Sequence, residues 1–246
     1  MVFNAGVMTT PAFSISNLHY KTPQQTLFED VSLTIPAQQT SCILGENGAG
    51  KSTLLRLILN LAPVLSGDIQ ISGKSHQLPA ARSPIAFLPD RYAPPYFLTG
   101  RDYLDYSLKL YNTQLTSSAS DMLEQLGLSQ TVLANRVRQY SKGMVQKLCL
   151  ASCLLSNKAI IVLDEPFSGL DPSARFQVKQ LFKARVAEGA TLLFTSHLLA
   201  DVEEIADNTM ILHHGEFCYV GPTQGCLEAY QASTLEQAYL KAIGFK

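Results

Sequence analysis

The sequence predicts an α/β fold built on a parallel sheet. Residues 159–163 and 191–195 are almost purely apolar runs, which are typical of strands buried on both faces. Between them, residues 173–188 carry apolar side chains at helical spacing, and Gly189 ends the helix. This strand–helix–strand order predicts a parallel sheet whose strands are joined by right-handed crossovers. The predicted helical stripe consists of Phe176, Leu181, Phe182 and Val186.

In the N-terminal part, apolar and polar residues alternate as in β-strands over residues 13–20 and 28–35. Residues 41–90 then predict a strand, a glycine-rich loop, a helix, a turn at residues 66–68 and a strand over residues 85–88.

The remaining chain divides into a helical insertion and a return to the sheet. Residues 90–155 begin with prolines and then show helical periodicity near residues 103–111 and 122–126. Residues 210–219 predict a hairpin turning at His214-Gly215, and the tail from Leu227 is helical.

Composition narrows the possible functions. The formal net charge of −1 gives no basic field for nucleic acid or anionic lipid. Charged residues make up 16%, against about 25% in an average soluble protein, which suggests that other chains cover part of the surface, although a hydrophobic core accounts for some of the shortfall. Five cysteines favour a reducing compartment, and Cys149 and Cys153 are interpreted as buried helical thiols rather than zinc ligands.

No targeting segment is expected. Residues 1–11 lack the basic start and long apolar stretch of a secretory signal. No apolar run is long enough to span a membrane, and residues 148–155 come nearest.

The glycine-rich run GENGAGKS fits G-x-x-x-x-G-K-[ST] between a predicted strand and a predicted helix. Its backbone N–H groups and the helix N-terminus favour a phosphate anion. Lys51 is expected to reach the β- and γ-phosphates, and Ser52 is expected to hold Mg²⁺. The alternative is a glycine-rich surface turn. The predicted nucleotide-binding residues here are Gly45, Glu46, Asn47, Gly48, Ala49, Gly50, Lys51, Ser52 and Thr53.

Two carboxylates follow the apolar strand over residues 160–163, at the edge of the sheet where ligands bind. Asp164 is suited to Mg²⁺ opposite Ser52, and Glu165 is suited to activating or orienting an attacking water. The alternative for both is a helix cap or a loop acid.

A family resemblance rests on these two motifs and four others. The run DEPFSGLD, residues 164–171, resembles the Walker B motif and D-loop of ATP-binding cassette (ABC) ATPases. The run YSKGM resembles the family's signature sequence, and its Ser141 lies 23 residues before Asp164. His197 matches the family's switch histidine, and Tyr20 matches the aromatic that stacks on adenine. The resemblance covers about residues 13–222.

The resemblance implies a P-loop NTPase parallel-sheet core, an N-terminal antiparallel β subdomain and a helical signature subdomain. It implies one ABC ATPase domain over residues 1–246: a core at about 13–89 and 156–222, a helical subdomain at about 90–155, and a helical tail at about 223–246.

The resemblance also assigns roles to single residues. Glu165, His197 and Lys51 are the expected catalytic residues. Ser141 and Gly143 are expected to bind the γ-phosphate of a nucleotide held by another subunit, and Asp171 helps to align the two subunits. Alternatives remain for several of these.

In the simpler interpretations, Tyr20 is an edge-strand aromatic, His197 is a capping or core histidine, and Ser141 and Asp171 are helix caps. The other histidines, His19, His76, His213 and His214, are expected to be surface or turn residues.

Three positions depart from the family pattern. Asp90 stands where a glutamine is usual, and it is either a Mg²⁺ ligand or a loop acid. Lys142 and Met144 stand where glycine and glutamine are usual. This signature resembles the ATPase subunits of ABC-2-type exporters, which are bacterial systems.

The function implied is an ATP-hydrolysing subunit that binds ATP and Mg²⁺ and works as a head-to-tail dimer, for which two copies of this chain suffice. A separate polytopic membrane permease is the expected partner, so the chain is expected to be cytoplasmic and peripheral on the inner face of the membrane. Residues 94–97 form either an apolar knob for that permease or a packed proline-rich loop.

Three other functions are weighed against transport. A soluble ABC ATPase of nucleic acid or the ribosome would carry a basic patch, a coiled coil or a second cassette, none of which the sequence shows. An ATPase of cofactor assembly remains open, and a P-loop kinase leaves the signature and His197 unexplained.

Overall fold

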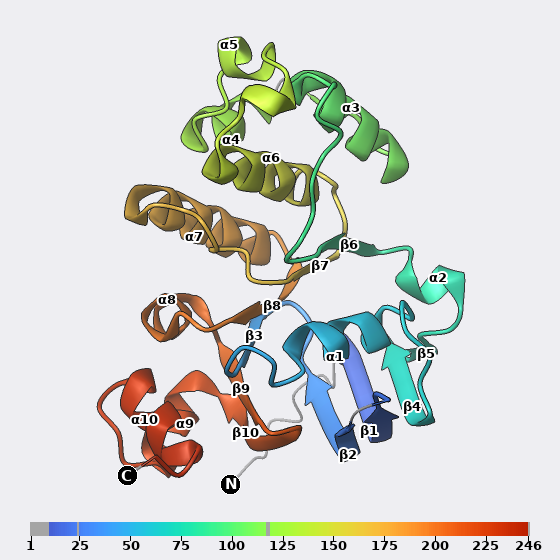
Figure 1. The fold of residues 1–246 in the computed structure, drawn as a ribbon, viewed down its shortest axis with the longest axis vertical. Helices are drawn as coiled ribbons and strands as arrows, with labels where there is room; N and C mark the ends of the chain where they lie inside the picture. Colours follow the sequence, from blue (N-terminus) through green and yellow to red (C-terminus); the bar gives the residue numbers. More distant parts are fainter. Residues whose placement is uncertain (1–9, 24, 117–118, 246) are drawn as a thin grey trace, which may run out of the picture.

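Two β-sheets and a set of helices make up the fold (Figure 1). The computed structural model describes residues 10–23, 25–116 and 119–245, so the expectation for a signal in residues 1–11 falls largely outside the described residues. The larger sheet has the order β10-β9-β3-β8-β7-β6. Its strands β9, β3, β8, β7 and β6 are parallel, and β10 returns antiparallel to β9. The bounds are β3 (Thr40–Leu44), β6 (Ile85–Leu88), β7 (Ile160–Leu163), β8 (Thr191–Ser196), β9 (Asn208–His213) and β10 (Glu216–Pro222).

The smaller sheet is antiparallel and has the order β2-β1-β4-β5. Its strands are β1 (Phe13–Lys21), β2 (Thr26–Ile35), β4 (Ser66–Ile71) and β5 (Lys74–Ser75). The turn predicted at residues 66–68 is wrong, because β4 begins there and pairs with β1. Gly67 has φ +103°, and a Cβ on it would lie 2.6 Å from the Asn17 carbonyl oxygen. This glycine therefore allows two strands to approach closely and does not mark a turn.

The helices lie in three groups (Figure 1). Helices α3 to α6 gather at one end, which confirms the helical character predicted between residues 90 and 155. Helix α7 lies between that end and the larger sheet, and α9 and α10 lie beside the C-terminus. The bounds are α1 (Lys51–Ile58), α2 (Pro79–Arg82), α3 (Gly100–Leu110), α4 (Ala119–Gln125), α5 (Gln130–Leu133), η1 (Val137–Gln139), α6 (Lys142–Leu154), α7 (Pro172–Ala187), α8 (Leu199–Ile205), α9 (Thr223–Ala229) and α10 (Leu235–Ala242). Across residues 10–23, 25–116 and 119–245, no helix has the length and hydrophobicity needed to cross a bilayer.

The larger sheet is apolar on both faces. In β8, Leu192 and Phe194 belong to one core with the helices, whereas Leu193 belongs to a second core with α1 and the smaller sheet. The parallel strands are therefore covered on both sides, as their apolar sequences predict. Their carboxyl ends remain open at one edge, where the candidate site is found.

Two sequence predictions about burial are wrong. Phe176 is 51% exposed, whereas Leu181 and Phe182 of the same predicted stripe are buried, together with Val178. His76 is buried rather than a surface residue, and its Nδ1 lies 3.0 Å from the Ile69 carbonyl oxygen. Burial lowers the pKa of His76, because it disfavours the protonated ring.

Helices α7 and α8 are joined by a cluster of buried ion pairs. Asp201 Oδ2 accepts from Arg175 Nη1 at 2.8 Å, and Asp201 Oδ1 accepts from Lys179 Nζ at 3.0 Å. Lys179 also pairs with Glu204. Burial by itself would lower the pKa of Lys179, but its bonds to Glu204 and Asp201 outweigh burial and raise it.

Asp201→Ala is expected to destabilise the fold by about 3 kcal/mol, because it leaves two partly buried cations without their shared carboxylate. Urea unfolding followed by circular dichroism measures this change. Asp121→Ala, at an exposed position of α4, is the control. A loss equal to that of the control would show that the cluster adds nothing to stability.

Candidate functional site

The glycine-rich loop joins β3 to α1 at the carboxyl edge of the larger sheet. Gly45 packs closely against the backbone of Leu212: a Cβ added to Gly45 would lie 2.4 Å from the Leu212 carbonyl oxygen. Gly50 has φ +109° and lies against the ring of Phe28. Both ends of the loop thus require glycine, and the backbone N–H groups between them can turn toward an anion.

An open hollow of about 620 Å³ lies over this loop. Its volume is in the range of small-molecule sites. The predicted residues that line it are Glu46, Asn47, Gly48, Gly50, Lys51, Ser52, Thr53, Asp90, Glu165 and His197. The structure therefore brings together the glycine-rich loop, the second carboxylate and the switch histidine. Thr22, Gln25, Leu27, Arg91 and Ser168 also line it, and the sequence motifs do not identify them.

Lys51 and His197 hold the carboxylate of Glu165 between them. Glu165 Oε1 lies 3.2 Å from Lys51 Nζ, and Oε2 lies 2.9 Å from His197 Nδ1. Lys51 Nζ also donates to the carbonyl oxygens of Gly45 at 2.6 Å and Glu46 at 3.3 Å. Although Lys51 is its ion-pair partner, Oε1 is buried and takes no well-aligned hydrogen bond within the described residues. Oε1 therefore keeps a lone pair that no hydrogen bond occupies, as a general base requires.

The backbone of Glu165 is in a strained conformation. Its φ is +50°, in the left-handed region that residues other than glycine rarely adopt. Such a conformation costs about 1–3 kcal/mol and persists only where surrounding contacts impose it.

Asp164 is buried at the end of β7, and its Oδ1 accepts a hydrogen bond from Thr195 Oγ1 at 2.6 Å. The same Thr195 oxygen accepts from the Glu165 N–H at 2.9 Å. Thr195 thus contacts both residues of the acidic pair, and the sequence motifs do not identify it. The available signal is a hydroxyl at the carboxyl end of the strand next to β7.

The oxygen donors near the loop fit a hard divalent cation. The hydroxyl of Ser52 lines the hollow, and Asp164 makes no hydrogen bond through Oδ2 to any described residue. Asp90 also lines the hollow; its side chain is 42% exposed and lies 3.9 Å from Arg91 Nε. An oxygen-only set of hydroxyl and carboxylates suits Mg²⁺.

Seven predicted site residues do not line the hollow: Tyr20, Gly45, Ala49, Asp164, Ser141, Gly143 and Asp171. Ser141 is the N-cap of α6 and accepts from the Met144 N–H at 3.2 Å, so its predicted capping role is confirmed. Asp171 caps α7 in the same way, and the Ala174 N–H lowers the pKa of that carboxyl. Gly143 faces Gly169, whose carbonyl oxygen would lie 3.1 Å from an added Cβ. None of these residues reaches the hollow of its own chain.

Helix α6 is nevertheless tied to the segment after Glu165. Gln146 Nε2 donates to the Pro166 carbonyl oxygen at 2.9 Å, and the alkyl stem of Lys142 packs over Gly169. The N-terminus of α6 therefore has a fixed position relative to the acidic pair of the same chain.

Tyr20 does not line the hollow over the glycine-rich loop. It lines a separate surface hollow with His19, Phe28 and Leu65. The apolar side chain that does line the site is Leu27. Adenine stacking on Tyr20 stays a prediction.

Cys149 and Cys153 are buried thiols of α6, as predicted. Burial raises the pKa of each to about 12. In the part of the chain that the structure describes, no group of three or more His, Cys, Asp or Glu side chains could hold a metal around them.

Comparison with known proteins agrees with this geometry. The family model described as "ABC transporter" matches residues 28–168. The uncharacterized ABC transporter ATP-binding protein sll0415 of Synechocystis is 35% identical over 78% of this chain, and the chain spans only 55% of that protein. The lantibiotic transport ATP-binding protein SrtF of Streptococcus pyogenes is 29% identical over 82% of this chain and 87% of its own length.

A solved structure described as an ATP-binding subunit of an ABC transporter has the same fold. Its TM-score is 0.81 at 26% identity, and the match covers 94% of this chain and 99% of that one. This similarity confirms the predicted α/β class and its two accessory regions.

Proposed function

Since this chain belongs to the ABC transporter family of ATP-binding proteins, which hydrolyse ATP, we propose that it powers an ABC-2-type exporter through a separate membrane subunit. One observation carries the proposal. The hollow collects Lys51, Glu165 and His197, whereas the cap at Ser141 and Gly143 lies outside it. A single chain thus carries both halves of a nucleotide site, but the two halves lie at separate places.

Two chains arranged head to tail would complete both halves. The N-terminus of α6 in one chain would then face the nucleotide held by the glycine-rich loop of the other. The free N–H groups there and the helix dipole favour a γ-phosphate. Identical chains suffice, because each carries both halves.

In this proposal, each of the following residues has a step of its own. The carboxylate of Glu165 takes a proton from the attacking water at Oε1, and His197 holds Oε2 so that the carboxylate cannot rotate. Lys51 leaves the carbonyl oxygens of its own loop and pairs with phosphate oxygens instead. Ser52, Asp164 and Asp90 would hold Mg²⁺, which when bound would neutralise charge on the β- and γ-phosphates.

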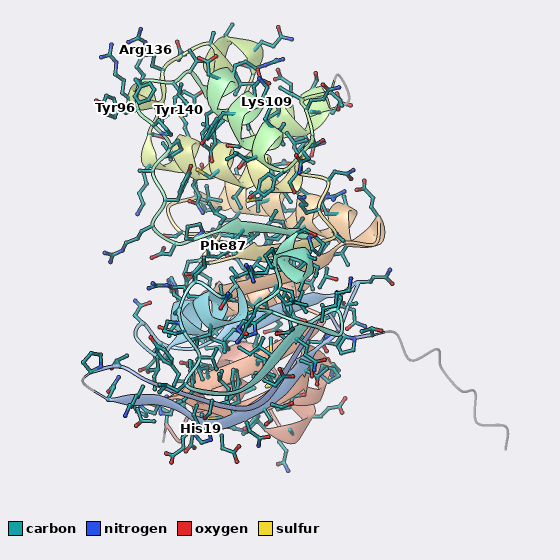
Figure 2. All side chains as sticks on the ribbon, turned by 90° about the vertical axis from the view of Figure 1, so that its right-hand side faces the viewer. His19, Phe87, Tyr96, Lys109, Arg136 and Tyr140 are labelled. Atoms are coloured by element: carbon teal, nitrogen blue, oxygen red, sulfur yellow. The ribbon has the colours of Figure 1, made fainter. Side chains whose placement is uncertain are left out.

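An exposed aromatic pair supports docking to a membrane subunit. Tyr96 is 68% exposed and Phe97 is 60% exposed, with their rings edge to face at 5.7 Å. In Figure 2, Tyr96 lies near Arg136 and Tyr140 at one edge of the helical end. The rings are not packed against the fold, although Pro94 before them is buried. Exposed aromatic side chains of this kind are enriched at protein interfaces.

Fewer observations support export than support docking to a membrane subunit. Lys142 and Met144 are the variants found in the exporter-like signature, an acid at the position of Asp90 also resembles some of that branch, and one relative is described as a lantibiotic transport ATP-binding protein. Binding to a permease would place the chain on the inner face of the membrane. A soluble role in cofactor assembly is the alternative.

Substitution of Tyr96 and Phe97 by serine is expected to reduce recovery of a polytopic membrane protein with the tagged chain from detergent extracts at least tenfold. ATP hydrolysis by the isolated chain should stay within about twofold of the wild-type rate, because neither Tyr96 nor Phe97 lines the hollow. Phe176→Ser, at an exposed position of α7, is the control. Recovery of a soluble assembly complex instead, unaffected by the double substitution, would favour the alternative function.

A further inference from the structure

The hydroxyl of Thr195 joins the two carboxylate residues of the site. Thr195 is fully buried at the end of β8, and its oxygen has one proton and two lone pairs. The proton goes to Asp164 Oδ1 at 2.6 Å, and one lone pair accepts the Glu165 N–H at 2.9 Å. One side-chain atom therefore contacts a carboxylate and the backbone of the next residue.

The sheet register explains why this contact forms. Leu163 of β7 pairs with Phe194 of β8, so the next residues of the two parallel strands, Asp164 and Thr195, lie side by side. On its other side, Thr195 pairs with Ile43 of β3, the strand that leads into the glycine-rich loop. Thr195 therefore lies between the loop strand and the acidic pair.

Each bond restricts one group that the proposed function needs. With Oδ1 held by Thr195, the carboxylate of Asp164 cannot rotate freely, and its other oxygen keeps one direction. The Glu165 N–H bond helps to hold the left-handed backbone that lets its side chain reach Lys51 and His197. Two residues after Thr195, His197 holds the far end of the same side chain.

We propose that Thr195 is a positioning residue that orients Asp164 toward the divalent cation and Glu165 toward the attacking water. The proposal rests on the proposed function, because it assigns Asp164 to the cation. It requires a hydroxyl at this position. A serine should act like threonine, whereas valine, of the same shape, should not.

The test compares Thr195→Val with Thr195→Ser in the full chain. Mn²⁺ binding is measured by electron paramagnetic resonance with a non-hydrolysable ATP analogue present. Loss of a residue that orients a metal ligand weakens metal binding or activity by about 10- to 100-fold, and we expect this loss for valine in both Mn²⁺ affinity and kcat. Serine should stay within about threefold of wild type. Analogue affinity without metal should change less than twofold in either variant, because neither bond of Thr195 is to the loop.

Two results would overturn the proposal. Valine could bind Mn²⁺ and turn over ATP like the wild type. Alternatively, valine could weaken metal-free and metal-bound analogue equally, which would indicate a purely structural role. If valine does not fold, Thr195→Ala is measured in the same way, since it also removes the hydroxyl and leaves room for water. A wild-type chain that neither hydrolyses ATP nor binds Mn²⁺ with the analogue would instead contradict the proposed function.

Discussion

Glu165→Gln is expected to bind ATP and to form a stable dimer, while hydrolysing ATP about 10²- to 10⁴-fold more slowly than the wild type. The amide keeps the shape of the carboxylate but cannot accept the proton of the attacking water. It also removes the negative charge that lies 3.2 Å from Lys51 and opposes an incoming γ-phosphate. Binding should therefore survive, and the closed dimer should persist because its ATP is not consumed.

Two measurements check this expectation. Phosphate release gives the turnover rate, and size-exclusion chromatography with Mg²⁺ and ATP gives the dimer fraction. Glu216→Gln, at an exposed position of β10, is the matched control and should behave like the wild type. Turnover of Glu165→Gln at the wild-type rate would mean that Glu165 is not the base.

Lys51→Ala is expected to lose about 10- to 100-fold in ATP affinity, since hydrogen bonds to charged groups contribute about 1.5–3 kcal/mol. Lys51 is almost fully buried and already faces the hollow, where it bonds to the loop carbonyls. Titration with a fluorescent ATP analogue measures the loss. Lys74→Ala, at an exposed position of β5, is the control, and equal affinity of the two variants would remove the phosphate role of Lys51.

The same variant also tests the dimer. Lys51→Ala has a defective loop and an intact α6 N-terminus, whereas Ser141→Arg has the reverse. Each is expected to be inactive alone. Random pairing in an equal mixture leaves one intact composite site in each mixed dimer, so about a quarter of the wild-type activity should return. No recovery in mixtures that do pair would argue against a site shared between chains.

Much of the fold could be predicted because its signals are local. The apolar runs before Asp164 and in β8 are long enough to identify buried strands, and the helix after the glycine-rich loop follows from its spacing. The turn predicted at Gly67 was wrong because glycine occurs both in turns and where two strands approach closely. Only the position of β1 in the structure distinguishes the two cases. Likewise, the exposure of Phe176 depends on how α7 packs, which helical periodicity alone does not determine.

The candidate site was predictable where a motif has fixed spacing. Lys51, Glu165 and His197 come together as expected, although they are far apart in the sequence. Thr195 was missed because its role depends on the register of β7 against β8. For Tyr20, strand position alone did not predict which hollow the ring would line.

The hydrogen bond from Gln146 to the Pro166 carbonyl oxygen would link the two nucleotide sites of the proposed dimer. Pro166 directly follows Glu165, and Gln146 lies one turn after the helix start that would contact the opposite nucleotide. In the proposed dimer, hydrolysis of one nucleotide would then affect the binding of the other nucleotide through a few adjoining residues. The α6 N-terminus of each chain would therefore respond to the state of the nucleotide bound by that same chain.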